Sequence, residues 1–196
     1  MALREVIGSG KFATVQVPYN ILNPSAGQDV ADQFVEVDYG NVIADCARQQ
    51  MGVLAIRVYA GGALASQPPS PHTYQTKFFP LDLYERDQQR AEQLIQQLGV
   101  AVDLKEVALR YVLSHPQISG AIVGFADPQH VRDALSYLAV GPLSAALIAA
   151  VREAGGPAAR TRIRSVPRPP SSAASLRAIR VSPLRPIAAA MARARV

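Results

Sequence analysis

Two short loops carry residue types that could bind an anionic ligand. Gly61 and Gly62 follow an apolar run, and adjacent glycines let a backbone approach a phosphate closely. Asp127 precedes Pro128, which suits the first position of a helix, and the free N–H groups at a helix start attract anions. A plain flexible turn explains the two glycines equally well.

The other reactive residue types form no recognisable catalytic or metal site. Cys46 is the only cysteine, which excludes an internal disulfide and a cysteine-based zinc site, and its apolar neighbours predict a core position. Three histidines lack the spacing of metal ligands: His72, His115 and His130. Three acidic residues are expected to form a solvated patch in a loop rather than an acid–base pair: Asp82, Glu85 and Asp87. No Ser-His-Asp arrangement and no phosphate-loop motif is present.

Alternating apolar runs and helical patterns predict the elements that would position these loops. Three strands are expected, at residues 14–19, 52–58 and 118–123. A helix is expected to start at Asp38, which can cap it, and to stop at Gly52. Further helices are expected around 91–98, from Asp103 to His115, after Pro128 and over 142–154, with an irregular segment at 65–83. This order is typical of an α/β fold with a parallel sheet.

The helix after Pro128 has a clear apolar pattern. Four of its side chains are expected to face the core: Val131, Ala134, Leu135 and Leu138.

Charge is divided unevenly along the 196 residues. The net charge of +5 conceals an acidic body, since residues 1–154 hold all 15 acidic residues and 11 of the 20 basic ones. Residues 155–196 hold nine arginines, six prolines and no acidic residue, which predicts a disordered tail. A frameshift near residue 155 is a further hypothesis for this composition. Because residues 1–154 carry a net negative charge, the sequence does not indicate nucleic-acid binding by this part of the chain.

Three stretches resemble the second half of an aldo-keto reductase. They are TVQVPYNILNPSAG (14–27), MGVLAIRVYAGGAL (51–64) and KEVALRYVLSHPQISGAIVGFADPQHVRDAL (105–135). The resemblance implies a (β/α)₈ barrel of which residues 1–154 hold about the last three strands with their helices. Such barrels typically need about 250 residues.

The resemblance also implies where a nicotinamide nucleotide, NAD(P)(H), would bind. Gln16 matches the family glutamine that hydrogen-bonds the nicotinamide carboxamide. Arg57, Gly61 and Gly62 follow the next strand, where the family places cofactor-contacting residues. The last-strand loop and following helix would hold the adenosine end, with three candidate residues: Gly124, Phe125 and Arg132.

Several positions depart from the family pattern. Ile56 stands where many members carry an aromatic residue that stacks on nicotinamide, and Ala126 where many carry an arginine for the 2′-phosphate. Ala134 replaces a common asparagine. The family tetrad of Asp, Tyr, Lys and His belongs to the first half of the barrel, and no segment here matches it. No catalytic residue and no metal ligand is therefore assigned.

Two functions follow from this resemblance. The first is an NAD(P)(H)-dependent oxidoreductase that interconverts a carbonyl and an alcohol, on a small carbonyl or sugar-like substrate, if another polypeptide supplies the first half. The second is a non-catalytic fragment or pseudoenzyme that binds a nucleotide or a partner. Open sheet edges predict self-association or pairing with such a half. No membrane span is expected, and a cytoplasmic location is expected.

Overall fold

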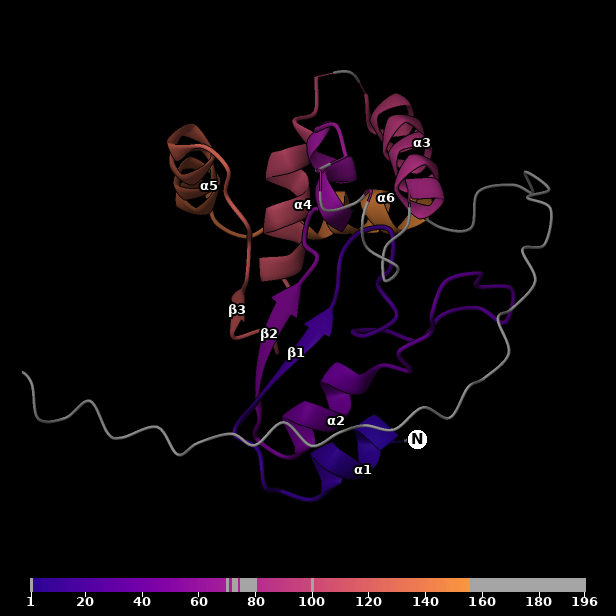
Figure 1. Ribbon diagram of the computed structural model, residues 1–196, viewed down its shortest axis with the longest axis vertical. Coiled ribbons are helices and arrows are strands. Elements are labelled where there is room, and N and C mark those ends of the chain that lie inside the picture. The colour runs from indigo at the N-terminus through magenta and orange to yellow at the C-terminus, as the bar shows by residue number, and fades with distance from the viewer. Residues whose placement is uncertain (1, 70, 72–73, 75–80, 100, 156–196) are drawn as a thin grey trace, which may run out of the picture. The chain divides into compact units, whose positions relative to one another are not determined.

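The computed structural model describes residues 2–69, 71, 74, 81–99 and 101–155 (Figure 1). The expected arginine-rich tail lies outside this part from residue 156 onward, as does His72. No helix in the described part of the chain combines the length and the apolar character needed to cross a membrane.

Three parallel strands form the sheet, in the order β1-β2-β3. Their bounds are Thr14–Pro18 for β1, Gly52–Ile56 for β2 and Gly120–Ala121 for β3. Gln16 pairs with Leu54, and Leu54 pairs in turn with Gly120. The expected parallel α/β order is confirmed, although β3 is shorter than the apolar run 118–123.

Helices connect and cover the strands. In chain order they are α1 (Ala2–Gly8), α2 (Val42–Arg48), the 3-10 helix η1 (Ala60–Ala65), α3 (Leu81–Leu98), α4 (Leu104–Leu113), α5 (Pro128–Val140) and α6 (Ala145–Ala154). Asp103 caps α4 by accepting from the Lys105 N–H, and Asp127 caps α5 by accepting from the Gln129 N–H. Both sequence-predicted helix starts are confirmed.

Helix α2 begins four residues later than the apolar pattern predicts. Gly40 and Asn41 have left-handed backbone angles, with φ of 61° and 55°, which a right-handed helix does not admit. Asp38 does not cap the helix, because its carboxylate accepts from the Gly40 N–H at 2.7 Å instead. Cys46, on α2, is buried as expected.

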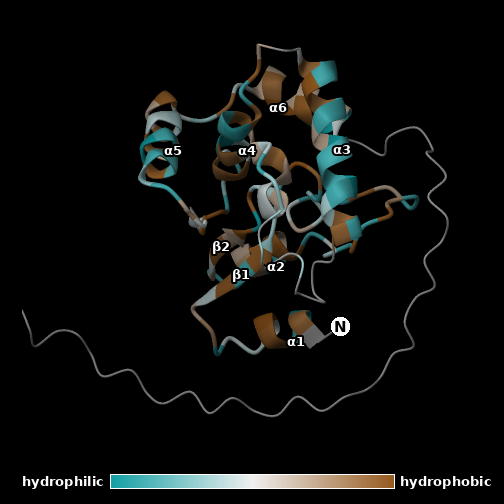
Figure 2. Cartoon of the chain, turned by 45° about the horizontal axis from the view of Figure 1, so that its top comes forward, coloured by the Kyte–Doolittle hydropathy of each residue, from teal (hydrophilic) through white to brown (hydrophobic). Residues whose placement is uncertain are grey.

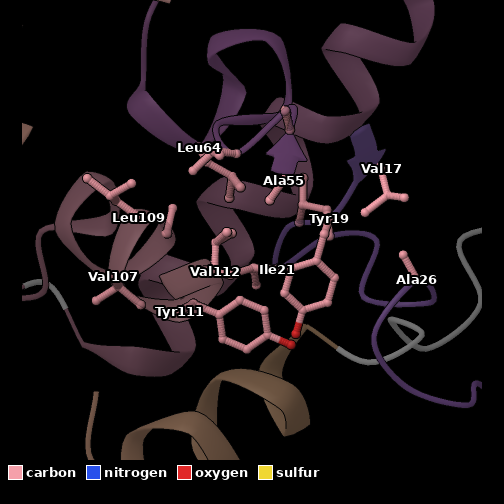
Figure 3. Packing of buried hydrophobic residues seen from close by; sticks show 14 of the residues in the cluster. Val17, Tyr19, Ile21, Ala26, Ala55, Leu64, Val107, Leu109, Tyr111 and Val112 are labelled. Carbon is pink, nitrogen blue, oxygen red and sulfur yellow. The ribbon is translucent and has the colours of Figure 1, made fainter. Parts of the chain in front are cut away.

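One face of the sheet carries the core. Val17, Val53 and Ala55 point into it and are almost fully buried, while Gln16 on the opposite face is exposed. Figure 3 shows Val17, Ala55 and Val112 in this cluster together with Tyr19 and Tyr111, whose rings stack at 5.7 Å. The core therefore lies between the sheet and the helices on a single side.

The acidic cluster of α3 is helical, not a loop, and one of its members is buried. Asp82 and Glu85 are exposed as expected, but Asp87 is buried and pairs with Arg86 at 3.1 Å. The interpretation of Asp87 as a solvated charge is wrong. Its position one helical turn from buried Tyr84 turns it toward the protein.

Glu36 fastens the long β1–α2 loop to α3. Its carboxylate lies 2.8 Å from the Arg86 guanidinium and 3.0 Å from the Arg90 guanidinium. Arg90 also donates to the Leu22 carbonyl at 2.8 Å. These side chains are largely buried, so each charge depends on its partners.

Replacing Glu36 by glutamine is expected to destabilise the protein. The change leaves two largely buried guanidinium groups short of a counter-charge, which should cost about 2 kcal/mol of unfolding free energy. Urea unfolding followed by circular dichroism measures it. Glu92→Gln, at an exposed position on the same helix, is the control and should change stability by less than about 0.5 kcal/mol. Equal effects of the two variants would contradict the role of Glu36.

The surroundings of the His115 ring predict that the free energy of unfolding depends on pH. His115 lies just beyond the C-cap of α4, and its Nε2 lies 3.2 Å from the Gly27 carbonyl oxygen. Burial lowers the pKa of His115, and Arg152 lowers it further, while the Gly27 carbonyl opposes both. Because the unfolded chain then binds more protons, stability should fall as the pH drops below about 6.5.

Urea unfolding at pH 7.5 and pH 5 measures this effect. His115→Gln should lose less stability between the two pH values than the unmodified protein, because it lacks the imidazole whose pKa burial lowers. An equal loss in both proteins would show that the pH dependence arises elsewhere.

Candidate functional site

A cavity of about 550 Å³ opens where β2 and β3 end. One wall is the segment after β2, including Arg57, Tyr59 and η1, and the other is the segment from Ile122 through α5. Parallel pairing places both strand ends at the same edge of the sheet, which is where α/β proteins carry their ligands. We call this space the strand-end cavity.

The backbone after β2 bends sharply to form the first wall. Arg57 has a left-handed backbone with φ of 59°, and Gly61 and Gly62 follow with φ of 74° and 109°. The two glycines allow this turn without strain, whereas Arg57 is held by a neighbour. The buried Asn20 side chain donates to the Arg57 carbonyl at 2.8 Å and accepts from two backbone N–H groups of its own loop.

Arg57 lies between the cavity and the charge cluster of α3. Burial lowers the pKa of its guanidinium, while Asp87 and Tyr39 raise it by favouring the charged form. Asp87 is the carboxylate that pairs with Arg86, so Arg57 adjoins the cluster that Glu36 completes. The cavity wall therefore holds a half-buried cation whose charge nearby acidic groups stabilise.

The second wall comes from β3 and α5. A side chain added at Gly124 would meet open space, so the backbone is freely accessible there. Phe125 is half-exposed at the rim. The α5 start offers N–H groups, although the Asp127 cap already accepts from Gln129 at 2.6 Å. This wall is thus mostly backbone and apolar surface.

Five of the seven sequence-predicted cofactor residues line the strand-end cavity. They are Arg57, Gly61, Gly62, Gly124 and Phe125. Gln16 lies on β1, exposed on the uncovered face of the sheet. Arg132 is exposed on α5, where its Nε donates to the Gln129 side chain at 2.9 Å. The structure does not bring these last two residues to the cavity.

Sequence reasoning missed the polar group at the α4–α5 end of the cavity. Tyr59, Lys105, Asp133 and Tyr137 line it, and the Tyr137 hydroxyl donates to Asp103 at 2.7 Å. Tyr59 lies three residues after β2 and directly after the predicted strand 52–58, so its position near a strand end was a usable signal. The sequence around Tyr137 carried no such signal, because the packing of α5 beside α4 places this side chain in the cavity wall.

The two cavity tyrosines are held in their neutral form. Burial raises the pKa of Tyr59 to about 12, and the Asp103 and Asp133 carboxylates contribute in the same direction. Burial and the hydrogen bond to Asp103 also raise the pKa of Tyr137. A general acid works best with a pKa near the operating pH, so this environment opposes proton donation by either hydroxyl.

A second, smaller cavity of about 110 Å³ lies beside Tyr19, Tyr111, His115 and Arg152. Tyr19 stacks on Tyr111 and meets the His115 ring edge-on (Figure 3 shows the two tyrosines). Burial raises the pKa of Tyr19. No group of three or more potential metal-ligating side chains occurs among the residues that the structure describes.

Comparisons with known proteins identify the family. The model of the aldo/keto reductase family matches residues 5–155. Among solved structures, the chain is similar to the aldo-keto reductase AKR11C1 from Bacillus halodurans in its holo form, with a TM-score of 0.57 and 17% identity. The apo form of that protein gives a TM-score of 0.55 and 18% identity.

Each of these two comparisons covers 84% of this chain and 50% of the other. The chain therefore spans about half the length of the solved relative that it matches. No curated protein matches the sequence. The family match extends over most of the chain and over every described strand, and the chain belongs to the aldo/keto reductase family.

Proposed function

We propose that the chain is the closing half of an aldo-keto reductase barrel and carries part of its nicotinamide-nucleotide site. The observation that carries this proposal is the strand-end cavity, which lies at the carboxyl ends of two parallel strands in a chain of this family. In a complete protein the reaction would be the interconversion of a carbonyl and an alcohol, on a small carbonyl or sugar-like compound.

The residues of the strand-end cavity fit a dinucleotide. The volume of the strand-end cavity, about 550 Å³, lies within the usual range for small-molecule sites. Arg57 supplies a positive charge for a phosphate, and the left-handed Gly61 and Gly62 leave the backbone uncovered beside it. Tyr59 and Phe125 add aromatic surface. When bound, a nicotinamide nucleotide supplies the hydride for such a reaction.

Gln16 fits the proposal only in a complete barrel. It is exposed on the sheet face opposite the core, beside Leu54 of β2, so its amide is free to meet a ring lying over that face. Arg132 is held to Gln129 on α5, which favours a surface role. Arg57, Gly61, Gly62, Gly124 and Phe125 remain the proposed cofactor residues.

We infer that the chain does not supply the proton for the reaction. The hydroxyl groups of Tyr59 and Tyr137 line the cavity, and burial raises the pKa of both, with neighbouring carboxylates acting in the same direction. A neighbouring cation would instead lower a tyrosine pKa toward the operating pH, where proton transfer is most efficient. This environment also supports the second candidate, a nucleotide-binding module without catalysis of its own.

Binding of NADH and NADPH, followed by the fluorescence of the nucleotide, tests the proposed site. Arg57→Gln should weaken binding about tenfold, because a charge-assisted hydrogen bond to phosphate is lost. Arg48→Gln is the matched control, since Arg48 lies on α2 and pairs with Asp45. Circular dichroism checks that both variants fold. Equal nucleotide affinity of the unmodified protein and Arg57→Gln would contradict the assignment.

An activity assay tests the missing proton donor. Purified chain incubated with NADPH and a reactive aldehyde should turn over at well under 1 s⁻¹, because most of the rate enhancement from acid catalysis and orientation is absent. Absorbance at the nicotinamide band measures the rate. Turnover above about 1 s⁻¹ would place a working proton donor in this chain.

A further inference from the structure

The cavity of about 110 Å³ lies apart from the strand-end cavity. Its wall is formed by the residue that follows β1, the end of α4 and one side of α6, and it shares no lining residue with the strand-end cavity. We call it the tyrosine cavity, after Tyr19 and Tyr111. Its volume is below the range of about 300–1,000 Å³ that is usual for drug-sized ligands, so a ligand here must be small.

Two buried tyrosines present their hydroxyl groups at this cavity. Tyr19 directly follows β1 and Tyr111 lies in the last turn of α4, and the two residues are 1% and 3% exposed. Their rings stack, and Figure 3 shows both hydroxyl oxygens side by side next to α6. Burial raises the pKa of Tyr19, so its hydroxyl keeps its proton and can donate a hydrogen bond.

Arg152 brings a positive charge to the two hydroxyl groups. It is the basic residue of α6, a helix that Figure 2 shows mostly in the brown of hydrophobic residues. Burial lowers the pKa of Arg152, but hydrogen bonding to Tyr111 and Tyr19 outweighs burial, and the pKa is raised. A guanidinium has five N–H donors, and each hydroxyl adds one, so the donors of this group outnumber its two phenolic oxygens. The group therefore lacks an acceptor.

The other polar side chains of the wall are already engaged within the protein. The Ser114 hydroxyl donates to the Arg110 carbonyl at 2.7 Å and accepts from the Leu143 N–H at 2.8 Å. The His115 ring contacts the Gly27 carbonyl through Nε2, and its Nδ1 accepts from the backbone N–H two residues further on. These contacts fix the wall, so recognition of a ligand falls to the guanidinium and the two tyrosine hydroxyl groups.

The charge of the wall selects the sign of the ligand. No acidic side chain is among the described residues that line the tyrosine cavity. Ile148 and Pro116 complete the wall with apolar surface, which lowers the local dielectric constant and strengthens the attraction of Arg152 for an anion. A guanidinium matches the paired oxygens of an oxyanion, with which it forms two parallel hydrogen bonds. The missing acceptor is therefore best supplied by a small oxyanion.

We propose that the tyrosine cavity binds an inorganic oxyanion of the size of phosphate. Arg152 holds two of its oxygens, and the hydroxyl groups of Tyr19 and Tyr111 donate to the oxygens that face them. The bound anion connects α6 to the end of α4 and to the chain after β1, and it stabilises the folded protein because it binds only where these three segments meet. This site is separate from the strand-end cavity, so the proposal is independent of nucleotide binding.

Nuclear magnetic resonance of the full ¹⁵N-labelled chain at pH 6.5 tests this proposal. The Nε–Hε signal of Arg152 is identified by its loss in Arg152→Gln. Sodium phosphate is titrated in exchange for sodium chloride at constant ionic strength. We expect a saturable shift of the Arg152 signal, with a dissociation constant in the millimolar range, and the same behaviour with sodium sulfate. A shift that rises linearly with phosphate, or no shift, would overturn the proposal.

Two variants remove the proposed donors, and the amide signals of residues 111–115 report binding in them. Arg152→Gln should weaken phosphate binding at least tenfold, and Tyr111→Phe about fivefold, because charge-assisted and neutral hydrogen bonds are lost. Arg48→Gln removes an exposed arginine of α2 and is the matched control, which should bind phosphate as tightly as the unmodified chain. Circular dichroism checks folding. Equal affinity of Arg152→Gln and Arg48→Gln would overturn the proposal.

The strand-end cavity is the other place where phosphate could bind, and Arg57→Gln separates the two. Phosphate affinity should be unchanged in this variant, and a loss of affinity there would overturn the proposal by assigning the anion to the strand-end cavity. NADH should leave the Arg152 signal unshifted, and displacement of phosphate by NADH would overturn the proposal as well. Saturable phosphate binding at Arg152 in a chain that binds no NADH would support this site and contradict the nucleotide site alone.

Discussion

Parallel pairing of β1, β2 and β3 is the constraint on which the rest of the described structure depends. Because all three strands run in one direction, their carboxyl ends meet at one edge, and the turns that follow β2 and β3 become neighbours. The strand-end cavity is a direct result of that geometry. The same pairing leaves the outer edges of β1 and β3 without a strand neighbour in the part of the chain that the structure describes.

Charge couples the cavity to the packing of the helices. Glu36 holds Arg86 and Arg90, and the adjoining Asp87 carboxylate stabilises the charged form of Arg57 at the cavity wall. Asn20 fixes the left-handed backbone of Arg57 from the other side. The position and the charge of this guanidinium therefore depend on a loop and a helix that are far from it in sequence.

Local signals in the sequence predicted the elements that depend on neighbouring residues. The caps at Asp103 and Asp127 and the apolar runs of β1 and β2 are confirmed, because each involves contacts within a few residues. The late start of α2 at Val42 could not be predicted from periodicity, since it follows from two left-handed residues. Burial of Asp87 is decided by contacts from distant segments. The same holds for the candidate site. The glycines that follow the strands could be predicted to line the cavity, whereas Tyr137 could not, because its position depends on the packing of α5.

Val131, Leu135 and Leu138, which the sequence pattern wrongly places in the core, form an exposed apolar row on α5, and this row has a consequence for the life of the protein in a cell. A polypeptide that displays such a row resembles a folding intermediate, and chaperones and proteases act on such surfaces. The amount of folded protein in a cell would then depend on whether this row is covered.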